Sequence, residues 1–188
     1  MIGRGMLFLV VGPSGVGKDS IIAGAAERLR DDKQIVFARR LITRPAEAGG
    51  EDHLAVTPPE FAEWRDTGRL MLHWRAHDLD YGLPQTLAAD LAAGRSVVAN
   101  VSRTVVAEAR LRFAPVGMIA ISASVETLAA RLASRGRETA ADIDSRLQRA
   151  AVSPSQPDFV IDNDGRLDKA IDRFVAILRE AIAQPASG

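Results

Sequence analysis

Residues 7–20 of the chain read Leu7-Phe8-Leu9-Val10-Val11-Gly12-Pro13-Ser14-Gly15-Val16-Gly17-Lys18-Asp19-Ser20. The first five are apolar, which is typical of a buried strand, and the last begin a segment of helical period. Between them the chain fits every position but the last of the phosphate-binding pattern G-x-x-x-x-G-K-[ST]. Glycines allow consecutive backbone N–H groups to turn toward a phosphate, the helix that follows presents its positive end, and the lysine bridges the outer phosphates. We therefore predict a nucleotide-phosphate loop consisting of Gly12, Pro13, Ser14, Gly15, Val16, Gly17, Lys18, Asp19 and Ser20.

The last position of the pattern, where a Ser or Thr hydroxyl usually coordinates Mg²⁺, is Asp19. A carboxylate also binds Mg²⁺, directly or through water, and it adds a charge that has to be offset nearby. We therefore expect Asp19 to be a ligand on the metal side. Two alternatives stay open: Ser20 supplies the hydroxyl after a shift of one residue, or Asp19 only stabilises the helix N-terminus.

The composition limits the class of protein. The 188 residues are 47% hydrophobic and 26% charged, which suits one domain over residues 1–188 with a full-sized core. The 24 basic and 24 acidic residues balance, so the net charge gives no reason to expect nucleic acid or an acidic membrane as a partner. The absence of cysteine excludes disulfides and thiolate chemistry and permits a cytoplasmic location. The apolar residues 6–11 are too few to span a membrane, and we expect small-molecule partners, with a homodimer compatible with the sequence.

Short β-type runs alternate with segments of helical period. We expect strands at 7–11, 34–38, 96–100, 118–122 and 158–161. Helices are expected at 20–30, 58–67, 84–93, 104–112, 125–134, 141–151 and 167–183, with Gly68, Gly94 and Gly136 ending three of them. The alternation predicts an α/β fold of the P-loop NTPase type, in which helices flank a parallel sheet and ligands bind at the carboxyl ends of its strands. The segment 40–59, rich in Gly, Pro and charge, predicts a functional loop.

Two pairs of arginines near the last third of the chain are candidates for a lid over the phosphates. Arg131 and Arg135 lie four residues apart on one expected helix, and Arg146 and Arg149 lie three apart on the next, so each pair shares a helix face. Cationic groups that close over a transferring phosphoryl group stabilise its negative charge and exclude water. The alternative is a pair of solvated helices with ordinary ion pairs. The phosphate loop favours the lid, at about residues 131–150.

The ordered motifs of the chain resemble those of the guanylate kinase family of nucleoside monophosphate kinases. Besides residues 12–18 they are Thr43-Arg44-Pro45, Tyr81-Gly82, Arg131-Leu132-Ala133-Ser134-Arg135-Gly136 and Ile161-Asp162-Asn163-Asp164. The resemblance covers almost the whole chain. It implies a guanylate kinase-like fold with a core, the lid and an acceptor-binding subdomain at about residues 40–83.

The chain departs from that family where the family reads guanine. Counting from Tyr81-Gly82, the family's Glu, its Ser or Thr and its Asp are replaced by Leu72, by Leu83-Pro84 and by Asn100. A site that hydrogen-bonds a base loses several kcal/mol of discrimination when its polar groups become apolar. Guanylate is therefore expected to be a poor substrate.

The phosphate side of the acceptor site is kept. The resemblance assigns Arg44 and Tyr81 to the acceptor's phosphate, with His53 near the place of a phosphate-binding Tyr and Arg103 as a further cation. An acceptor with a phosphate and without a base resembles the substrate of one branch of the family, which phosphorylates ribose 1,5-bisphosphate to 5-phosphoribosyl 1-diphosphate in phosphonate catabolism. Three further stretches resemble that branch: Gly17-Lys18-Asp19-Ser20, Gly49-Gly50-Glu51 and Asn100-Val101-Ser102-Arg103.

The resemblance implies a phosphotransferase in which ATP and Mg²⁺ occupy the phosphate loop and the γ-phosphoryl passes in line to the sugar's 1-phosphate. An ionised phosphate needs no general base, and the cations Lys18, Arg131, Arg135 and Arg146 are the expected stabilisers of the transition state. Val98 and Asn100 stand where guanylate kinases have acidic residues. We hypothesise that the carboxylate of Asp19 replaces their charge.

Two other functions stay open at this point. One is a nucleoside monophosphate kinase with an altered base site, and the other is a binding module without catalysis. Lys18 and the loop glycines are intact, which disfavours the binding module. A metal site at His73 and His77 is disfavoured because residues 70–76 have the pattern of a strand and no third ligand is evident.

Overall fold

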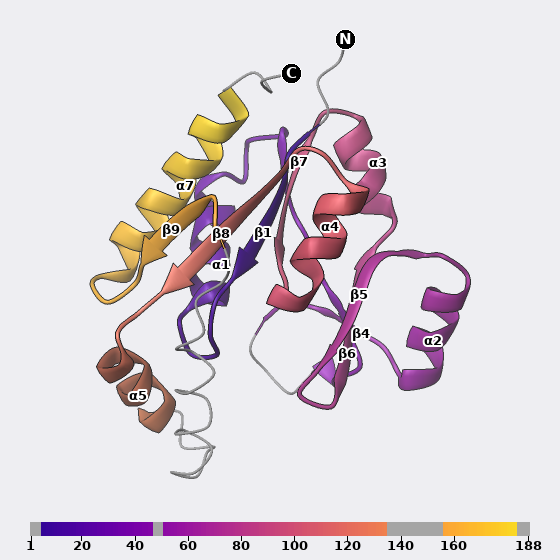
Figure 1. Ribbon diagram of the computed structural model, residues 1–188, viewed down its shortest axis with the longest axis horizontal. Coiled ribbons are helices and arrows are strands. Elements are labelled where there is room, and N and C mark those ends of the chain that lie inside the picture. The colour runs from indigo at the N-terminus through magenta and orange to yellow at the C-terminus, as the bar shows by residue number, and fades with distance from the viewer. Residues whose placement is uncertain (1–4, 47–50, 135–155, 184–188) are drawn as a thin grey trace.

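A five-stranded parallel sheet forms the centre of the protein in the computed structural model, which describes residues 5–46, 51–134 and 156–183 (Figure 1). Its strands run in the order β2 (Ile35–Phe37), β7 (Ser96–Asn100), β1 (Leu7–Val11), β8 (Val116–Ser122) and β9 (Phe159–Asp162). β1 lies in the middle and pairs in parallel with β7 and β8. The five expected strands and the α/β class are confirmed, and the loop after β1 leaves the sheet at its centre.

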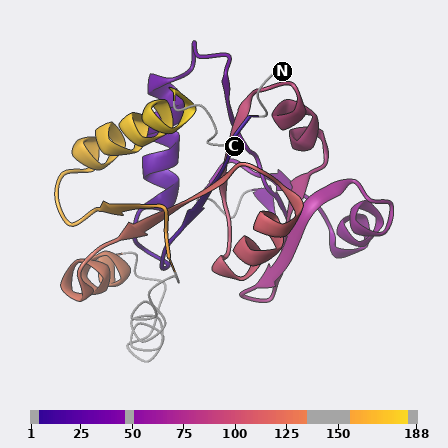
Figure 2. The ribbon, with the colours of Figure 1, turned by 45° about the horizontal axis from the view of Figure 1, so that its top comes forward.

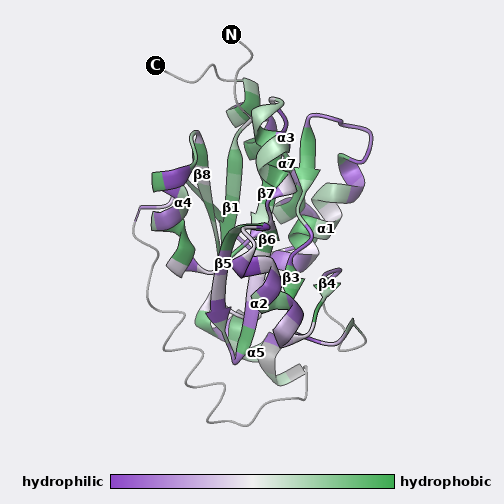
Figure 3. Ribbon diagram, turned by 90° about the vertical axis from the view of Figure 1, so that its right-hand side faces the viewer, coloured by the Kyte–Doolittle hydropathy of each residue, from purple (hydrophilic) through white to green (hydrophobic). Residues whose placement is uncertain are grey.

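Helices cover both faces of this sheet (Figure 2). On one face, α1 (Lys18–Arg28) and α7 (Leu167–Ala183) share a core with Phe8 and Val10. On the other face, α3 (Thr86–Ala92) and α4 (Val106–Arg112) share a core with Leu7 and Leu9. Side chains alternate across a strand, so an unbroken apolar run such as β1 supplies both cores at once. In Figure 3 the strands of the sheet accordingly carry the hydrophobic colour.

Local signals explain the ends of the helices. α2 (Pro58–Asp66) begins with a capping box, in which the Thr57 side chain accepts from the backbone of Glu60 and the Glu60 side chain accepts from the backbone of Thr57. Gly68 follows at a φ of 70° and Gly94 follows α3 at 84°, values that favour glycine. Both expected stops are confirmed. α5 (Val125–Ser134) follows β8, whereas Gly136 and the helix expected at 141–151 lie outside the described residues.

A second sheet of four strands lies beside the first (Figure 1). Its order is β4 (Leu54–Ala55), β3 (Leu41–Ile42), β6 (Leu79–Pro84) and β5 (Leu70–Ala76). β5 and β6 form an antiparallel hairpin, and their residues Leu72 and Leu83 belong to the same core as Leu7. This shared core joins the second sheet to the central one. The sheet occupies the part of the chain in which the sequence predicts an acceptor-binding subdomain.

Two predictions of local structure are wrong. The pattern predicts a helix from Pro84, but Pro84 ends β6 opposite Leu70, and α3 begins at Thr86. A proline is tolerated at the end of a strand because no ladder N–H is needed there. The segment 40–59 is predicted to be a loop but contains β3 and β4, which have two residues each and are too short to produce a pattern. Among the described residues no helix is both long enough and apolar enough to cross a membrane.

Candidate active site

The phosphate loop joins β1 to α1 and ends with Gly17 as the residue before the helix. Gly17 has a φ of 94°, and a Cβ at this position would lie 2.6 Å from Nδ2 of Asn163, so both the backbone and the space require glycine. α1 begins at Lys18, two residues earlier than its sequence predicts. Lys18 Nζ donates to the carbonyl oxygens of Gly12, at 2.8 Å, and Pro13, at 3.0 Å. The ammonium group therefore lies over the loop, where a phosphate bound by the loop N–H groups would meet it.

Burial lowers the pKa of Lys18 from its usual 10.5 to about 8. The negative charge of Asp19 opposes this effect, and the positive charges of Arg40 and Arg103 add to it. The carboxylates of Asp19 and Glu51 offset only part of the cost of burying this cation near Arg40 and Arg103, and a bound anion would stabilise it further. The electrostatics of the loop thus fit a polyanionic ligand.

A brace behind the loop comes from two distant segments. The side-chain amide of Asn163, in the loop after β9, donates to the carbonyl oxygen of Val16 at 2.8 Å. Arg131 of α5 donates to the same oxygen at 3.4 Å and to the carbonyl oxygen of Asn163 at 2.7 Å. Asn163 is almost fully buried, so these bonds hold the loop from inside the protein. The sequence motif that contains Asn163 was a family resemblance only, and its physical role becomes visible in the fold.

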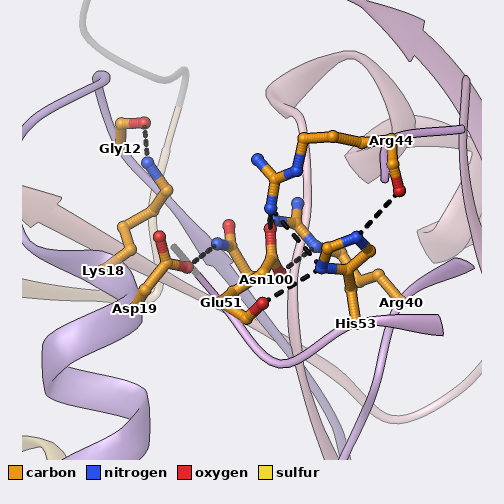
Figure 4. A network of polar contacts seen from close by, with 8 residues as sticks. All are labelled: Gly12, Lys18, Asp19, Arg40, Arg44, Glu51, His53 and Asn100. Atoms are coloured by element: carbon orange, nitrogen blue, oxygen red, sulfur yellow. Dashed lines mark hydrogen bonds and ion pairs between the residues drawn. The ribbon is translucent and has the colours of Figure 1, made fainter. Parts of the chain in front are cut away.

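Asp19 and Asn100 meet at the metal side of the loop. Nδ2 of Asn100, at the end of β7, donates to Oδ1 of Asp19 at 2.7 Å (Figure 4). This contact places the carboxylate beside the position at which guanylate kinases have an acidic residue, which supports the hypothesis that Asp19 replaces that charge. Mg²⁺ is usually bound by one or two carboxylates together with phosphates and waters, so the donors present fit this ion. Among the described residues no three His, Cys, Asp or Glu side chains cluster as a metal site of their own, His73 and His77 included.

The acceptor side contains Arg44 and His53, and the ring of His53 contacts the backbone of the segment that carries Arg44. The His53 side chain is buried, with Nε2 3.1 Å from the carbonyl oxygen of Arg44 and Nδ1 3.0 Å from that of Glu51. His53 therefore contacts the backbone at both ends of the segment that carries Arg44. Nε of Arg44 is buried and has no hydrogen-bond partner among the described residues. Arg44 thus keeps an unused hydrogen-bond donor, and its Nη2 lies 3.5 Å from Nδ1 of His53. Contact of Arg44 and of His53 with a phosphate stays a prediction.

Tyr81 is held by a cross-strand pair. It lies opposite Trp74 in the β5–β6 hairpin, and the two rings stack with centroids 5.5 Å apart. Burial raises the pKa of the Tyr81 hydroxyl more than the charges of Arg40 and Arg44 lower it. The hydroxyl therefore stays protonated at neutral pH and can donate a hydrogen bond to a phosphate oxygen.

Sequence reasoning missed a buried ion pair between Arg40 and Glu51. Glu51 accepts from Nε of Arg40 at 2.8 Å and also from its Nη2, and Arg40 is only 8% exposed. The guanidinium carbon of Arg40 lies 5.2 Å from the centroid of the Tyr81 ring. The only available signal was the charge density of residues 39–52, and it does not say which arginine meets which carboxylate.

The place expected to read a base is closed. Leu72 and Leu83 are 0% exposed and pack in the main hydrophobic core. They therefore offer neither hydrogen bonds nor accessible surface to a purine. At these two positions the acceptor side is apolar and closed to solvent.

The remaining predicted residues are only partly placed. Arg103 begins the short 3₁₀ helix η2 (Arg103–Val105) after β7, and its positive charge adds a small part to the lowering of the Lys18 pKa that burial causes. Arg131 contacts the back of the phosphate loop, as described above. Arg135 and Arg146 lie outside the described residues. The lid therefore stays a prediction.

Comparison with known proteins agrees with this geometry. A family model described as guanylate kinase matches residues 4–181. The chain is 46% identical, over 98% of its length and 94% of the relative's, to the ribose 1,5-bisphosphate phosphokinase PhnN of Rhodopseudomonas palustris. It is 48% identical, over 93% of its length and 92% of the relative's, to the protein of the same name in Acidiphilium cryptum.

A solved structure with a similar fold is the guanylate kinase of Anaplasma phagocytophilum. The TM-score is 0.71 and the identity 22%, over 97% of this chain and 88% of the other. At this identity the likeness concerns the fold alone.

Proposed function

Since this chain belongs to the guanylate kinase family, we propose that it is the ATP-dependent kinase that converts ribose 1,5-bisphosphate to 5-phosphoribosyl 1-diphosphate in phosphonate catabolism. Two relatives that the chain matches over more than nine-tenths of their length, at 46% and 48% identity, carry the name of that activity. The observation on this chain that carries the proposal is an acceptor side that keeps cations for phosphate while Leu72 and Leu83, in the place of base readers, are fully buried.

The reaction transfers one phosphoryl group between phosphates. A nonbridging oxygen of the sugar's 1-phosphate forms a bond to the γ-phosphorus of ATP, the bond from that phosphorus to the β,γ-bridging oxygen breaks, and ADP leaves. The attacking oxygen is already ionised, so no general base is required. The protein's part is to place the two phosphates in line and to offset the charge between them.

In this proposal Lys18 binds the outer phosphates of ATP, and the backbone of residues 12–17 surrounds them. Mg²⁺, when bound, neutralises charge on the phosphates, and Asp19, held by Asn100, is its ligand on the protein. Arg44, Tyr81 and Arg103 bind the bisphosphate, and the lid arginines Arg135 and Arg146 close over the transferred group. Arg131, which the sequence also predicts to be a lid residue, has its guanidinium bonded to the carbonyl oxygens of Val16 and Asn163 and supports the phosphate loop from behind. A cytoplasmic location, where ATP is supplied, belongs to the same proposal.

The two competing functions fit less well. A nucleoside monophosphate kinase needs a surface that reads the base, and Leu72 and Leu83 are enclosed in the core. A binding module without catalysis has no use for Lys18, whose ammonium is kept over the loop with its pKa lowered by burial. Retaining such a lysine without an anionic ligand is costly.

The test is ADP release from Mg-ATP with ribose 1,5-bisphosphate or with GMP as acceptor. Lys18→Ala serves as the inactive variant, and Lys33→Ala, at an exposed lysine outside the site, serves as its matched control. We expect turnover with the bisphosphate in the wild type and in Lys33→Ala, none in Lys18→Ala, and little with GMP. Faster turnover of GMP than of the bisphosphate would contradict the proposal.

A further inference from the structure

Glu51 contacts two arginines, Arg40 and Arg44, with different geometry. It engages Arg40 through two parallel bonds, Nε to Oε2 at 2.8 Å and Nη2 to Oε1. Its Oε1 lies 3.9 Å from Nη2 of Arg44, beyond hydrogen-bond distance. A bidentate pair fixes the plane of a guanidinium group, whereas a single long contact leaves it able to turn. Arg40 is thus held by two bonds to Glu51, whereas the guanidinium of Arg44 has only long contacts, at 3.9 Å to Oε1 of Glu51 and at 3.5 Å to Nδ1 of His53.

The position of Arg40 is central to the site. Its guanidinium lies over the Tyr81 ring, and its charge lowers the pKa of both Tyr81 and Lys18. In Figure 4, Glu51 and Asn100 lie between Lys18 on one side and the arginines on the other. Arg40 therefore lies on the acceptor side of the site, with Glu51 between it and Lys18.

One hydrogen-bond donor of Arg44 is unused. Its Nε is buried without a hydrogen-bond partner among the described residues, which is unfavourable for a guanidinium N–H. A phosphate oxygen is the acceptor that suits this group best. Arg40 occupies both oxygens of Glu51, so the carboxylate does not hold Arg44 in a second bidentate pair. Without Glu51 the guanidinium of Arg40 would be free to turn, and its charge would displace the like-charged Arg44 from the acceptor's phosphate.

We propose that Glu51 is a positioning residue of the acceptor site: its carboxylate fixes Arg40 and thereby keeps Arg44 available for the acceptor's phosphate. Glu51 acts through the two arginines and does not touch the transferred phosphoryl group. The inference rests on the proposed function, because the phosphate concerned belongs to ribose 1,5-bisphosphate. By charge alone a carboxylate beside this polyanion is unfavourable, so its location calls for a geometric reason.

Whether the KM for the acceptor rises or falls in Glu51→Gln tests the positioning role of Glu51. Glu51→Gln removes one negative charge from the site and with it the ion pair that holds Arg40. We expect the KM for ribose 1,5-bisphosphate to rise about tenfold, which corresponds to one misplaced charge-assisted hydrogen bond. The KM for ATP should stay within about twofold, since the contacts of Lys18 with its loop are untouched. A Glu51 that acted only as a negative charge would give the opposite result, tighter binding of the acceptor.

Two further variants separate geometry from charge. Glu51→Asp keeps the charge but is one methylene shorter, so it should raise the acceptor KM as well. Asp52→Asn is the matched control, because Asp52 pairs with Arg39 at 2.7 Å and both side chains are exposed. It should behave as the wild type. An Asp variant at position 51 with unchanged kinetics would overturn the proposal.

A double-mutant cycle tests whether Glu51 acts through Arg40. We expect Arg40→Gln combined with Glu51→Gln to lose no more acceptor affinity than the worse single variant, and additive losses would refute the coupling. Melting temperatures and binding of an ATP analogue verify that each variant is folded. If Glu51→Gln does not fold, Glu51→Asp and the neutral double variant still decide the question.

The outcomes also separate the two proposals. A wild type that does not use ribose 1,5-bisphosphate overturns the proposed function. A wild type that uses it, with Glu51→Gln indistinguishable from Asp52→Asn or with a lowered acceptor KM, overturns the role of Glu51 alone.

Discussion

The charge state of Lys18 makes the affinity for ATP depend on pH in a defined direction. Burial lowers the pKa of Lys18 to about 8, and binding of a triphosphate, by placing negative charge beside the ammonium, raises it again. The pKa of the free protein therefore lies below that of the complex, and binding takes up a proton near and above pH 8. Full affinity is present below the lower pKa and is lost as the pH rises through it.

The size of the effect follows from the protonated fraction. If only the charged lysine binds well, the fraction falls from about nine-tenths at about pH 7 to about one-tenth at about pH 9, so the affinity should fall roughly tenfold, or about 1.4 kcal/mol. The dependence levels off once the pH exceeds the pKa of the complex.

The assay is calorimetric titration with a nonhydrolysable ATP analogue at fixed ionic strength. Repeating it at about pH 8.5 in two buffers of different ionisation enthalpy measures the proton uptake directly. Lys18→Arg is the control, because guanidinium stays charged over this range and its affinity should not vary with pH. A wild-type affinity that is constant between neutral and alkaline pH, with no proton uptake, would refute the assignment of a lowered pKa to Lys18.

Three other changes have expected outcomes. Asp19→Ser should raise the Mg²⁺ concentration needed for half-maximal activity. Asn100→Ala should raise it by less, because this variant removes only the 2.7 Å bond to Asp19. An unchanged metal requirement in both variants would rule out Asp19 as a ligand. Asn163→Leu leaves the carbonyl of Val16 without its 2.8 Å donor and should cost about 1–3 kcal/mol in unfolding free energy, measured by denaturant titration. Leu72→Glu should not create activity with GMP but should lower the melting temperature by several degrees, since it buries a carboxylate in the core.

The phosphate loop could be predicted because its determinants are contiguous. A buried strand, glycines and a helix start follow one another within residues 7–20, and the backbone geometry depends on that local order. The strands β1 and β7 were found for a similar reason, since strands buried on both faces are continuous apolar runs. The edge strands β2 and β9 are only partly buried, and short apolar runs between helical segments indicated them. The fold class and the course of the loop that carries Lys18 were therefore available from the sequence, and phosphate binding by Lys18 stays a prediction.

The second sheet was only partly predictable. β5 shows a strand pattern, but β3 and β4 are two-residue strands whose existence depends on pairing with each other and with β6. Pro84 illustrates the same limit: the residue type fits either a helix start or a strand end, and the pairing with Leu70 decides between them.

The order of residues along the chain was enough to predict a nucleotide-phosphate loop and the loss of the residues expected to read guanine. Which charged side chains of the site pair with one another became known from the tertiary structure alone. Asp19 is hydrogen-bonded to Asn100, 81 positions later, and Val16 to Asn163, 147 positions later. Glu51 forms its bidentate ion pair with Arg40 and not with the nearby Arg39 or Arg44. Ion pairs and hydrogen bonds form only when side chains are positioned to within a few tenths of an ångström, and the chain reaches that positioning only after the sheets have packed.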